Sequence, residues 1–259
     1  MGVASALSYD GVSKDYLYSH LGRTTVTRGV AELNLQVAAG EAVGLLGLNG
    51  SGKTTTMKLA LGLLAPTRGA VLVFGSPAGG RETRRRMGYL PELPYFQPYL
   101  TPAETLRLFG RLSGLGAAEL GGRIAESLER VGLSAQADRR MTGFSKGMLQ
   151  RVGMAQCLLH DPQLLLLDEP VSGLDPLAIA EFRDLLGRLR EAGVALLIAS
   201  HSISELERVC DRAAILADGR VARVAAQSEW SASPGRLEDI FVETVRPAAQ
   251  TLGPAARAA

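Results

Sequence analysis

Cysteines, charge of one sign and long apolar runs are all scarce in this sequence of 259 residues. Its two cysteines, Cys157 and Cys210, cannot form the disulfide framework of a small secreted domain, and no Cys/His spacing resembles a zinc site. A reducing compartment is the interpretation that fits this usage. Lys and Arg number 28 against 26 Asp and Glu, a formal net charge of +2. That excess is too small for the electrostatic footprint of a nucleic-acid-binding protein, so we expect no nucleic-acid partner.

Targeting and membrane-crossing segments are missing as well. The first residues lack the basic start and apolar core of a secretory signal peptide. No apolar stretch reaches the roughly 18 residues that a membrane-spanning helix needs. The leading apolar runs, Leu164–Leu167 and Val194–Ala199, have the length of buried strands. The sequence therefore predicts a soluble chain, for which any role at a membrane comes through a partner.

The composition that is present is globular, with 46% hydrophobic and 21% charged residues. Short apolar runs alternate with amphipathic helical patterns, which is typical of an α/β domain around a mostly parallel sheet. Strands are predicted over residues 31–37, 42–46, 71–74, 164–167, 195–199 and 213–216. The turn Asp218-Gly219 leads from the last of these into a further strand over residues 221–224.

The middle of the chain, from about Tyr95 to Ala137, has a different character. Thr101-Pro102-Ala103-Glu104 has the form of a capping box with proline at the first helical position, which predicts a helix start. Residues 118–131 predict a second helix, and no convincing strand lies between the two. This pattern indicates a helical insertion into the α/β body. Near the C-terminal end, residues 237–241 predict a short helix, and the residues from 244 to 259 predict a flexible tail.

One glycine-rich stretch predicts a phosphate-binding loop. Gly47-Leu48-Asn49-Gly50-Ser51-Gly52-Lys53-Thr54 fits the pattern G-x-x-x-x-G-K-S/T and lies between a predicted strand and a predicted helix, with Thr55 following. Glycines let the backbone bend so that several N–H groups and a helix N-terminus face the phosphates. Lys53 is expected to reach the β- and γ-phosphates, and the Thr54 hydroxyl to bind Mg²⁺. The alternative, a flexible glycine turn before a helix, is disfavoured by the full motif in this context.

An acidic pair ends the strongest predicted strand. Leu164-Leu165-Leu166-Leu167 runs directly into Asp168-Glu169. Successive side chains of a strand point in opposite directions, so the two carboxylates can take different tasks. Asp168 is suited to bind Mg²⁺. Glu169 is suited to act on the attacking water, as a general base or as a positioning group. A solvated loop after a core strand would be the alternative for such a pair without a phosphate loop upstream.

Three further motifs resemble those of ATP-binding cassette (ABC) ATPases. Phe144-Ser145-Lys146-Gly147-Met148-Leu149-Gln150-Arg151 resembles the family's signature motif, and Ser172-Gly173-Leu174-Asp175-Pro176 resembles its D-loop. His201 follows a predicted strand where the family has its switch histidine. Order and spacing match over roughly residues 7–243.

The resemblance implies a fold, a reaction and a dimer. It implies the P-loop NTPase fold of the ABC type, with a RecA-like core, an N-terminal antiparallel β region and a helical subdomain at about 95–160. It implies hydrolysis of ATP with Mg²⁺, with Glu169, His201 and Lys53 as catalytic residues. It also implies a head-to-tail dimer with a second copy or a homologous ATPase, in which the signature residues Ser145 and Gly147 meet the nucleotide of the partner, and it implies that Asp175 of the D-loop binds ATP. Tyr16 lies where the family often places an aromatic residue against adenine.

The sequence departs from the family pattern at two places. Lys146 and Met148 replace a glycine and the glutamine of the signature, while Ser145 and Gly147 are retained. Glu92 stands where most members have glutamine, and Gln97 is nearby but out of register. We expect the Glu92 carboxylate to face Mg²⁺ and water.

These departures, and the element at residues 237–241, resemble single-cassette ATPases that serve two-component exporters of the ABC-2 type. The resemblance implies a separate polytopic membrane permease, contacted around Glu92 to Thr105, and a cytoplasmic location on the inner face of the membrane. Two alternatives remain: a soluble cassette ATPase acting on nucleic acid or the ribosome, and a scaffold ATPase in cofactor assembly. The short basic clusters Arg84-Arg85-Arg86 and Arg139-Arg140 are typical of solvated faces or of neighbours of lipid headgroups.

Overall fold

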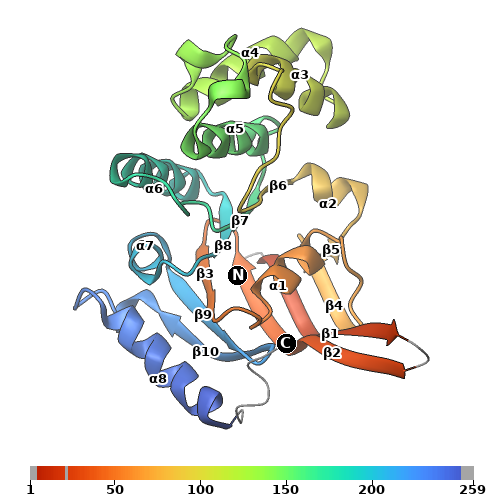
Figure 1. The fold of residues 1–259 in the computed structure, drawn as a ribbon, viewed down its shortest axis with the longest axis vertical. Coiled ribbons are helices and arrows are strands. Elements are labelled where there is room, and N and C mark those ends of the chain that lie inside the picture. The colour runs from red at the N-terminus through yellow and green to blue at the C-terminus, as the bar shows by residue number, and fades with distance from the viewer. Residues whose placement is uncertain (1–4, 21–22, 252–259) are drawn as a thin grey trace.

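The computed structural model describes residues 5–20 and 23–251. The fold contains two β-sheets (Figure 1). The larger sheet has the strand order β10-β9-β3-β8-β7-β6. Its strands are β3 (Ala42–Gly47), β6 (Met87–Leu90), β7 (Leu164–Asp168), β8 (Ala195–Ala199), β9 (Arg212–Ala217) and β10 (Arg220–Ala226). All neighbours in it are parallel except β9 and β10, which form the predicted hairpin. The predicted mostly parallel sheet is therefore confirmed.

The smaller sheet is antiparallel and has the order β2-β1-β4-β5. It consists of β1 (Ser5–His20), β2 (Arg23–Ala38), β4 (Arg68–Val73) and β5 (Ser76–Pro77). The strand predicted over residues 31–37 is the second half of β2. The strand begins earlier, at Arg23, and pairs with β1 in a long antiparallel hairpin. This sheet is the N-terminal antiparallel region that the family resemblance implies.

The central strands carry side chains into two separate cores. Leu165 and Leu167 of β7 pack with the helices on one face of the larger sheet. Leu164 and Leu166 of the same strand pack with the antiparallel sheet on the other face. A parallel strand that is covered on both sides has no polar face, so β7 reads as an unbroken leucine run. Cys157 and Cys210 are both buried as free thiols.

Eight α-helices surround the sheets within the described residues. They are α1 (Lys53–Ala60), α2 (Arg81–Arg85), α3 (Pro102–Leu112), α4 (Ala117–Arg130), α5 (Lys146–Leu158), α6 (Pro176–Glu191), α7 (Ile203–Val209) and α8 (Arg236–Thr251). Short 3₁₀ turns lie at Ser134–Gln136, Met141–Gly143 and Gln227–Glu229. None of the helices in these ranges combines the length and the apolarity that crossing a membrane requires.

The helices α3, α4 and α5 gather at one end of the molecule, where α5 packs against β6 of the larger sheet (Figure 1). The predicted capping box is present at the start of α3, where Thr101 and Glu104 each bond the backbone N–H of the other. The group matches the helical insertion expected from the sequence, and α5 leads back into the larger sheet through β7.

The C-terminal part of the chain differs from the sequence interpretation. The helix expected over residues 237–241 extends from Arg236 to Thr251, so residues 244–251 are helical where a tail is predicted. Leu237, Ile240 and Val245 lie at helical spacing and are buried, which explains why the helix continues past the predicted end. Residues 252–259 of the predicted tail lie outside the described residues.

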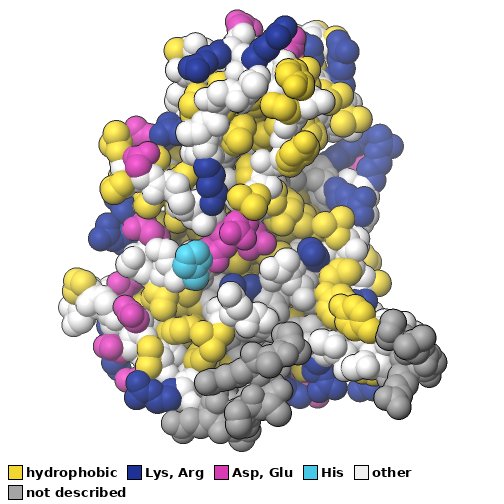
Figure 2. All heavy atoms as spheres, viewed as in Figure 1, with side chains coloured by type: hydrophobic (Ala, Val, Ile, Leu, Met, Phe, Trp, Pro, Cys, Tyr) yellow, Lys and Arg dark blue, Asp and Glu magenta, His cyan; other side chains and the backbone are white. Residues whose placement is uncertain are grey.

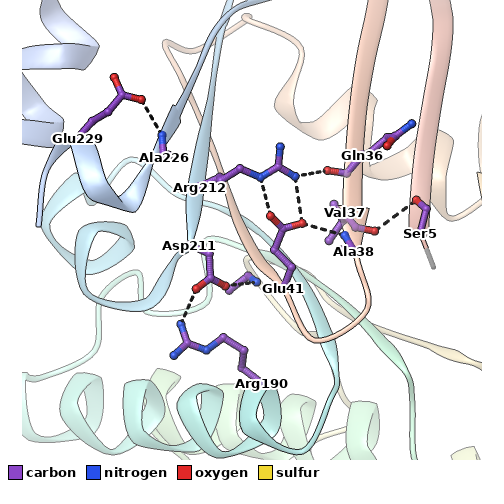
Figure 3. A network of polar contacts seen from close by, with 11 residues as sticks. Ser5, Gln36, Val37, Ala38, Glu41, Arg190, Asp211, Arg212, Ala226 and Glu229 are labelled. Atoms are coloured by element: carbon purple, nitrogen blue, oxygen red, sulfur yellow. Dashed lines mark hydrogen bonds and ion pairs between the residues drawn. The ribbon is translucent and has the colours of Figure 1, made fainter. Parts of the chain in front are cut away.

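A half-buried polar network joins the two sheets at the start of β3 (Figure 3). Arg212 donates to both carboxylate oxygens of Glu41, at 2.5 and 3.0 Å, and to the carbonyl of Gln36 at 2.7 Å. Burial by itself raises the pKa of Glu41, but the bonds from Arg212 and from the amide of Ala38 outweigh it and hold the pKa below its ordinary value. Asp211 accepts from Arg190 and from the amide of Ala42, which ties α6 to the same corner.

Candidate nucleotide-binding site

The predicted phosphate loop connects the buried strand β3 to helix α1. Gly50 and Gly52 have φ angles of +81° and +107°, a region that side chains with a Cβ rarely adopt. A Cβ on Gly52 would also lie 2.7 Å from the carbonyl oxygen of Gly29, so no other residue fits there without a shift. Leu48, Asn49 and Gly50 are exposed, and the loop therefore opens to solvent.

Lys53 lies across this loop. Its Nζ donates to the carbonyl oxygens of Gly47 and Leu48, at 2.6 and 3.2 Å. Burial lowers the pKa of Lys53, and the carboxylates of Glu169 and Asp168 oppose that shift. The lysine thus faces its own loop on one side and the acidic pair on the other.

The residues around the loop fit a phosphate-bearing ligand with a divalent cation. Gly52, the N-cap of α1, has no side chain to cap the first turn, so those N–H groups face outward. The buried hydroxyl of Ser51 has no hydrogen-bond partner within the described part of the chain. The exposed Thr54 hydroxyl and the Asp168 carboxylate are oxygen ligands of the kind that Mg²⁺ prefers.

Asp168 ends β7 close to four other charged side chains. Burial is the largest cause that raises the pKa of Asp168, and the carboxylates of Glu169 and Glu92 raise it further. Lys53 and Lys58 lower it. The structure therefore brings together four residues predicted from three separate motifs. Acidic side chains gather beside a histidine in the middle of the face drawn in Figure 2.

Glu169 is held at several atoms. Its backbone has a φ of +49°, and its amide donates to the carbonyl of Ala199 at 2.8 Å. Its Oε2 lies 2.7 Å from the Nδ1 of His201 and accepts from the backbone amide of His201 at 3.2 Å. The hydroxyl of Ser200 donates to the same oxygen at 3.2 Å. A non-glycine residue at positive φ is strained, and such strain concentrates at functional positions.

The signature and D-loop residues form a second cluster. Ser145 caps α5 by accepting from the amide of Met148 at 3.2 Å, and Asp175 caps α6 by accepting from the amide of Ala178 at 3.0 Å. Lys146, which replaces the usual glycine, reaches the Ser172 hydroxyl at 3.4 Å. A Cβ on Gly147 would lie 3.3 Å from Leu174, so the start of α5 packs closely on the D-loop.

Tyr16 lies next to the phosphate loop through its hydroxyl, which is 3.2 Å from the hydroxyl of Thr55. Its ring covers Gly29, where a Cβ would come within 2.6 Å of the ring. Sequence reasoning missed Gly29, which contacts both Tyr16 and Gly52 and carries no motif. It also missed Ser200, whose only signal is its place directly before His201.

Comparison with known proteins agrees with this arrangement. The family model described as "ABC transporter" matches residues 30–172. An uncharacterized ABC transporter ATP-binding protein of Nostoc sp. is 49% identical over 190 residues, which are 73% of this chain and 57% of that protein. The bacitracin transport ATP-binding protein BcrA of Bacillus licheniformis is 40% identical over 197 residues, 75% of this chain and 63% of that protein.

Solved structures of ATP-binding cassettes also resemble this chain. The ATP-binding subunit of an ABC transporter superposes with a TM-score of 0.78 at 32% identity, over 92% of this chain and 99% of that one. An ATP-binding cassette in a dimeric post-hydrolysis state with ADP and Pi superposes with a TM-score of 0.77 at 26% identity, over 85% and 98%.

The fold and the phosphate loop define a P-loop nucleotide-binding domain of the ABC type. The chain belongs to the ABC transporter family. Members of that family bind ATP with Mg²⁺. The matched region spans a little over half of the first two relatives' own lengths, 57% and 54%.

Proposed function

We propose that this chain binds Mg²⁺ and ATP, hydrolyses the ATP as a dimer, and powers a separate membrane permease that exports its cargo. One observation carries the hydrolytic part. The carboxylate of Glu169 is held by His201 at the end of β7, and its charge acts on Lys53 of the phosphate loop. A base, a phosphate-binding lysine and a metal-binding carboxylate, Asp168, are therefore gathered at one edge of the larger sheet, where β3 and β7 end on either side of β8.

Each residue has a task in this proposal. The loop from Gly47 to Thr55 and Lys53 bind the phosphates, and Tyr16 stacks on the adenine. Thr54, Asp168 and Glu92 hold Mg²⁺, which when bound neutralises charge on the β- and γ-phosphates. Glu169 accepts a proton from water while the water oxygen attacks the γ-phosphorus and the bond to the ADP oxygen breaks. His201 binds the γ-phosphate through its free ring nitrogen.

The proposed dimer explains why the site has two separate clusters. Ser145 and Gly147 lie at a second helix N-terminus, which is suited to bind phosphate but lies on α5, a different helix from the one after the phosphate loop. In a head-to-tail pair, the signature and Asp175 of one copy complete the site of the other. The dimeric cassette with ADP and Pi supports this arrangement.

The proposed permease contact lies between the larger sheet and the helical insertion. Leu93, Tyr95 and Tyr99 are exposed there, with Leu108 and Leu112 of α3. Exposed apolar groups of this kind are typical of a protein–protein contact. A relative named as a Nod factor export ATP-binding protein, 37% identical over 231 residues, supports an exporter. We propose a cytoplasmic location at the inner face of the membrane, a cassette over residues 7–243 and a helical subdomain at about 95–160.

The test of hydrolysis compares the wild-type chain with Glu169→Gln. Phosphate release is measured with Mg²⁺ and ATP, and nucleotide binding is measured in parallel. The amide has nearly the shape of the carboxylate but takes up no proton, so the variant should bind ATP and lose about 100-fold or more in turnover. Wild-type turnover in E169Q contradicts the proposed base.

The test of the partner is purification of the tagged chain from solubilised membranes. A polytopic protein that co-purifies, and that is lost when Tyr95 and Tyr99 are replaced by Asp, supports the permease. Ribosomes or soluble assembly complexes in its place contradict it.

A further inference from the structure

Ser200 lies between strand β8 and His201 and is almost completely buried, with 2% of its surface exposed. Its hydroxyl makes two hydrogen bonds. It accepts from the backbone amide of Ser202 at 3.0 Å, and it is 3.2 Å from Oε2 of Glu169. A backbone amide can only donate, and an ionised carboxylate can only accept. The hydroxyl proton of Ser200 therefore points at Glu169.

The bonds to Glu169 are asymmetric. The Ser200 hydroxyl, the His201 amide and the His201 ring all approach Oε2. In the described part of the chain, no hydrogen bond reaches the other oxygen, Oε1. Fixing one oxygen of a planar carboxylate sets the direction of the second, which leaves Oε1 available to water.

The two side chains that hold Oε2 differ in exposure. The His201 side chain is 71% exposed and is the group that the proposed function assigns to the γ-phosphate. Ser200 is buried, so its bond does not depend on the nucleotide. The backbone at Glu169 is already fixed by its bond to Ala199. The remaining freedom is in the carboxylate, and Ser200 is the buried side chain that restrains it.

We propose that Ser200 is a positioning residue for hydrolysis, which holds Oε2 of Glu169 so that Oε1 accepts the proton of the attacking water. This inference rests on the proposed function, because it needs Glu169 to act as the base. The alternative is that the Ser200 hydroxyl only stabilises the turn, by accepting the amide of Ser202. In that case, removing the hydroxyl would change the stability of the chain but not the turnover per folded molecule.

A matched pair of variants separates these two roles. Ser200→Thr keeps the hydroxyl, and Ser200→Val has nearly the same shape without it. A cavity of about 20 Å³ borders Ser200 and is also lined by Ile198, Leu206 and Val209. Thr and Val each add one γ-methyl group at this position, so the effect of that added volume is the same in both variants. Ser200→Ala is a third variant, which removes the hydroxyl without adding bulk.

The experiment measures phosphate release at saturating ATP, KM for ATP and the melting temperature of the full chain. We expect S200V and S200A to lose about ten-fold in kcat, the effect of one hydrogen bond to a charged group. We expect KM to change less than about two-fold, because within the described residues Ser200 makes no hydrogen bond to the phosphate loop. S200T should restore kcat to within about two-fold of the wild type.

The outcomes distinguish this inference from the proposed function. If S200T and S200V have equal kcat while E169Q is inactive, the positioning role of Ser200 is overturned and the proposed function is not. A loss in S200V that follows melting temperature, or that appears in KM and not in kcat, also overturns it. A wild-type chain without turnover, or an active E169Q, overturns the proposed function and this inference together.

Discussion

The Nδ1 atom of His201 lies 2.7 Å from Oε2 of Glu169. The Nδ1 side of the ring faces this carboxylate, and Nε2 is the ring nitrogen left for another partner. The His201 side chain is 71% exposed and that of Glu169 only 11%. The histidine therefore connects a shielded carboxylate to the open face where a nucleotide phosphate would lie.

Replacing His201 tests that connection. His201→Ala removes both nitrogens, while His201→Asn keeps a donor near Glu169 and lacks the distal nitrogen. Loss of one donor to a developing negative charge costs about 100-fold or more in kcat, so we expect both variants to be slow. ATP binding, measured with a fluorescent analogue, should be retained. An Asn variant with wild-type turnover would restrict the role of His201 to holding Glu169.

Lys53→Ala should weaken ATP binding. Lys53 is the cation of the loop, and loss of its charge-assisted bonds to phosphate should weaken binding by about 10- to 100-fold. The matched control is Lys58→Ala, because Lys58 is an exposed lysine in the last turn of the same helix that acts on the charge of Asp168 but does not belong to the loop. Titration calorimetry with Mg²⁺ and ATP measures both. Unchanged affinity in K53A contradicts the site.

Two glycine substitutions should have opposite effects on stability. Gly52→Ala places a Cβ 2.7 Å from the Gly29 carbonyl at a φ of +107°. It should lower the free energy of unfolding by about 1–3 kcal/mol, and it should also impair ATP binding. Gly121→Ala in α4 meets no atom within 4 Å and should stabilise the chain by about 1 kcal/mol. Thermal unfolding measures both changes. A stable, ATP-binding G52A would show that the loop does not need its observed backbone.

The Glu41–Arg212 pair predicts a pH dependence of unfolding. The pKa of Glu41 lies below its ordinary value of 4.5, so the folded state binds its proton more weakly than the unfolded state. Its contribution is present above pH 4.5 and is lost as the pH falls through the lowered pKa. Glu41→Gln should destabilise the chain at pH 7 by about 1–2 kcal/mol, with a smaller difference below pH 4.5. Urea unfolding at several pH values measures this. A difference that does not vary with pH contradicts the assignment.

The sequence predicts the elements whose local pattern and final environment agree. The leucine run of β7 is buried on both faces, and the start of α3 is set by a capping box between Thr101 and Glu104. The phosphate loop is equally local, since its glycines and Lys53 act within eight consecutive residues. These predictions need no knowledge of distant segments.

Other features depend on contacts between distant segments. The first half of β2 carries no clear apolar alternation and forms because β1 pairs with it residue by residue. The end of α8 depends on burial of Val245. Ser200 has no motif of its own, and its bond to Glu169 spans 31 positions in the sequence. Such relationships exist only once β7 and β8 lie side by side.

The most direct measurement of the central claim is ATP hydrolysis by a mixture of two inactive variants. K53A disables the phosphate loop. Ser145→Asp places a carboxylate in the path of the partner's phosphate but preserves the cap of α5, because Asp accepts the same backbone bond. If each ATP lies between two copies, an equal mixture contains mixed dimers with one intact site, and should recover about a quarter of wild-type turnover. A mixture as inactive as either variant alone would contradict an ATPase built from shared sites.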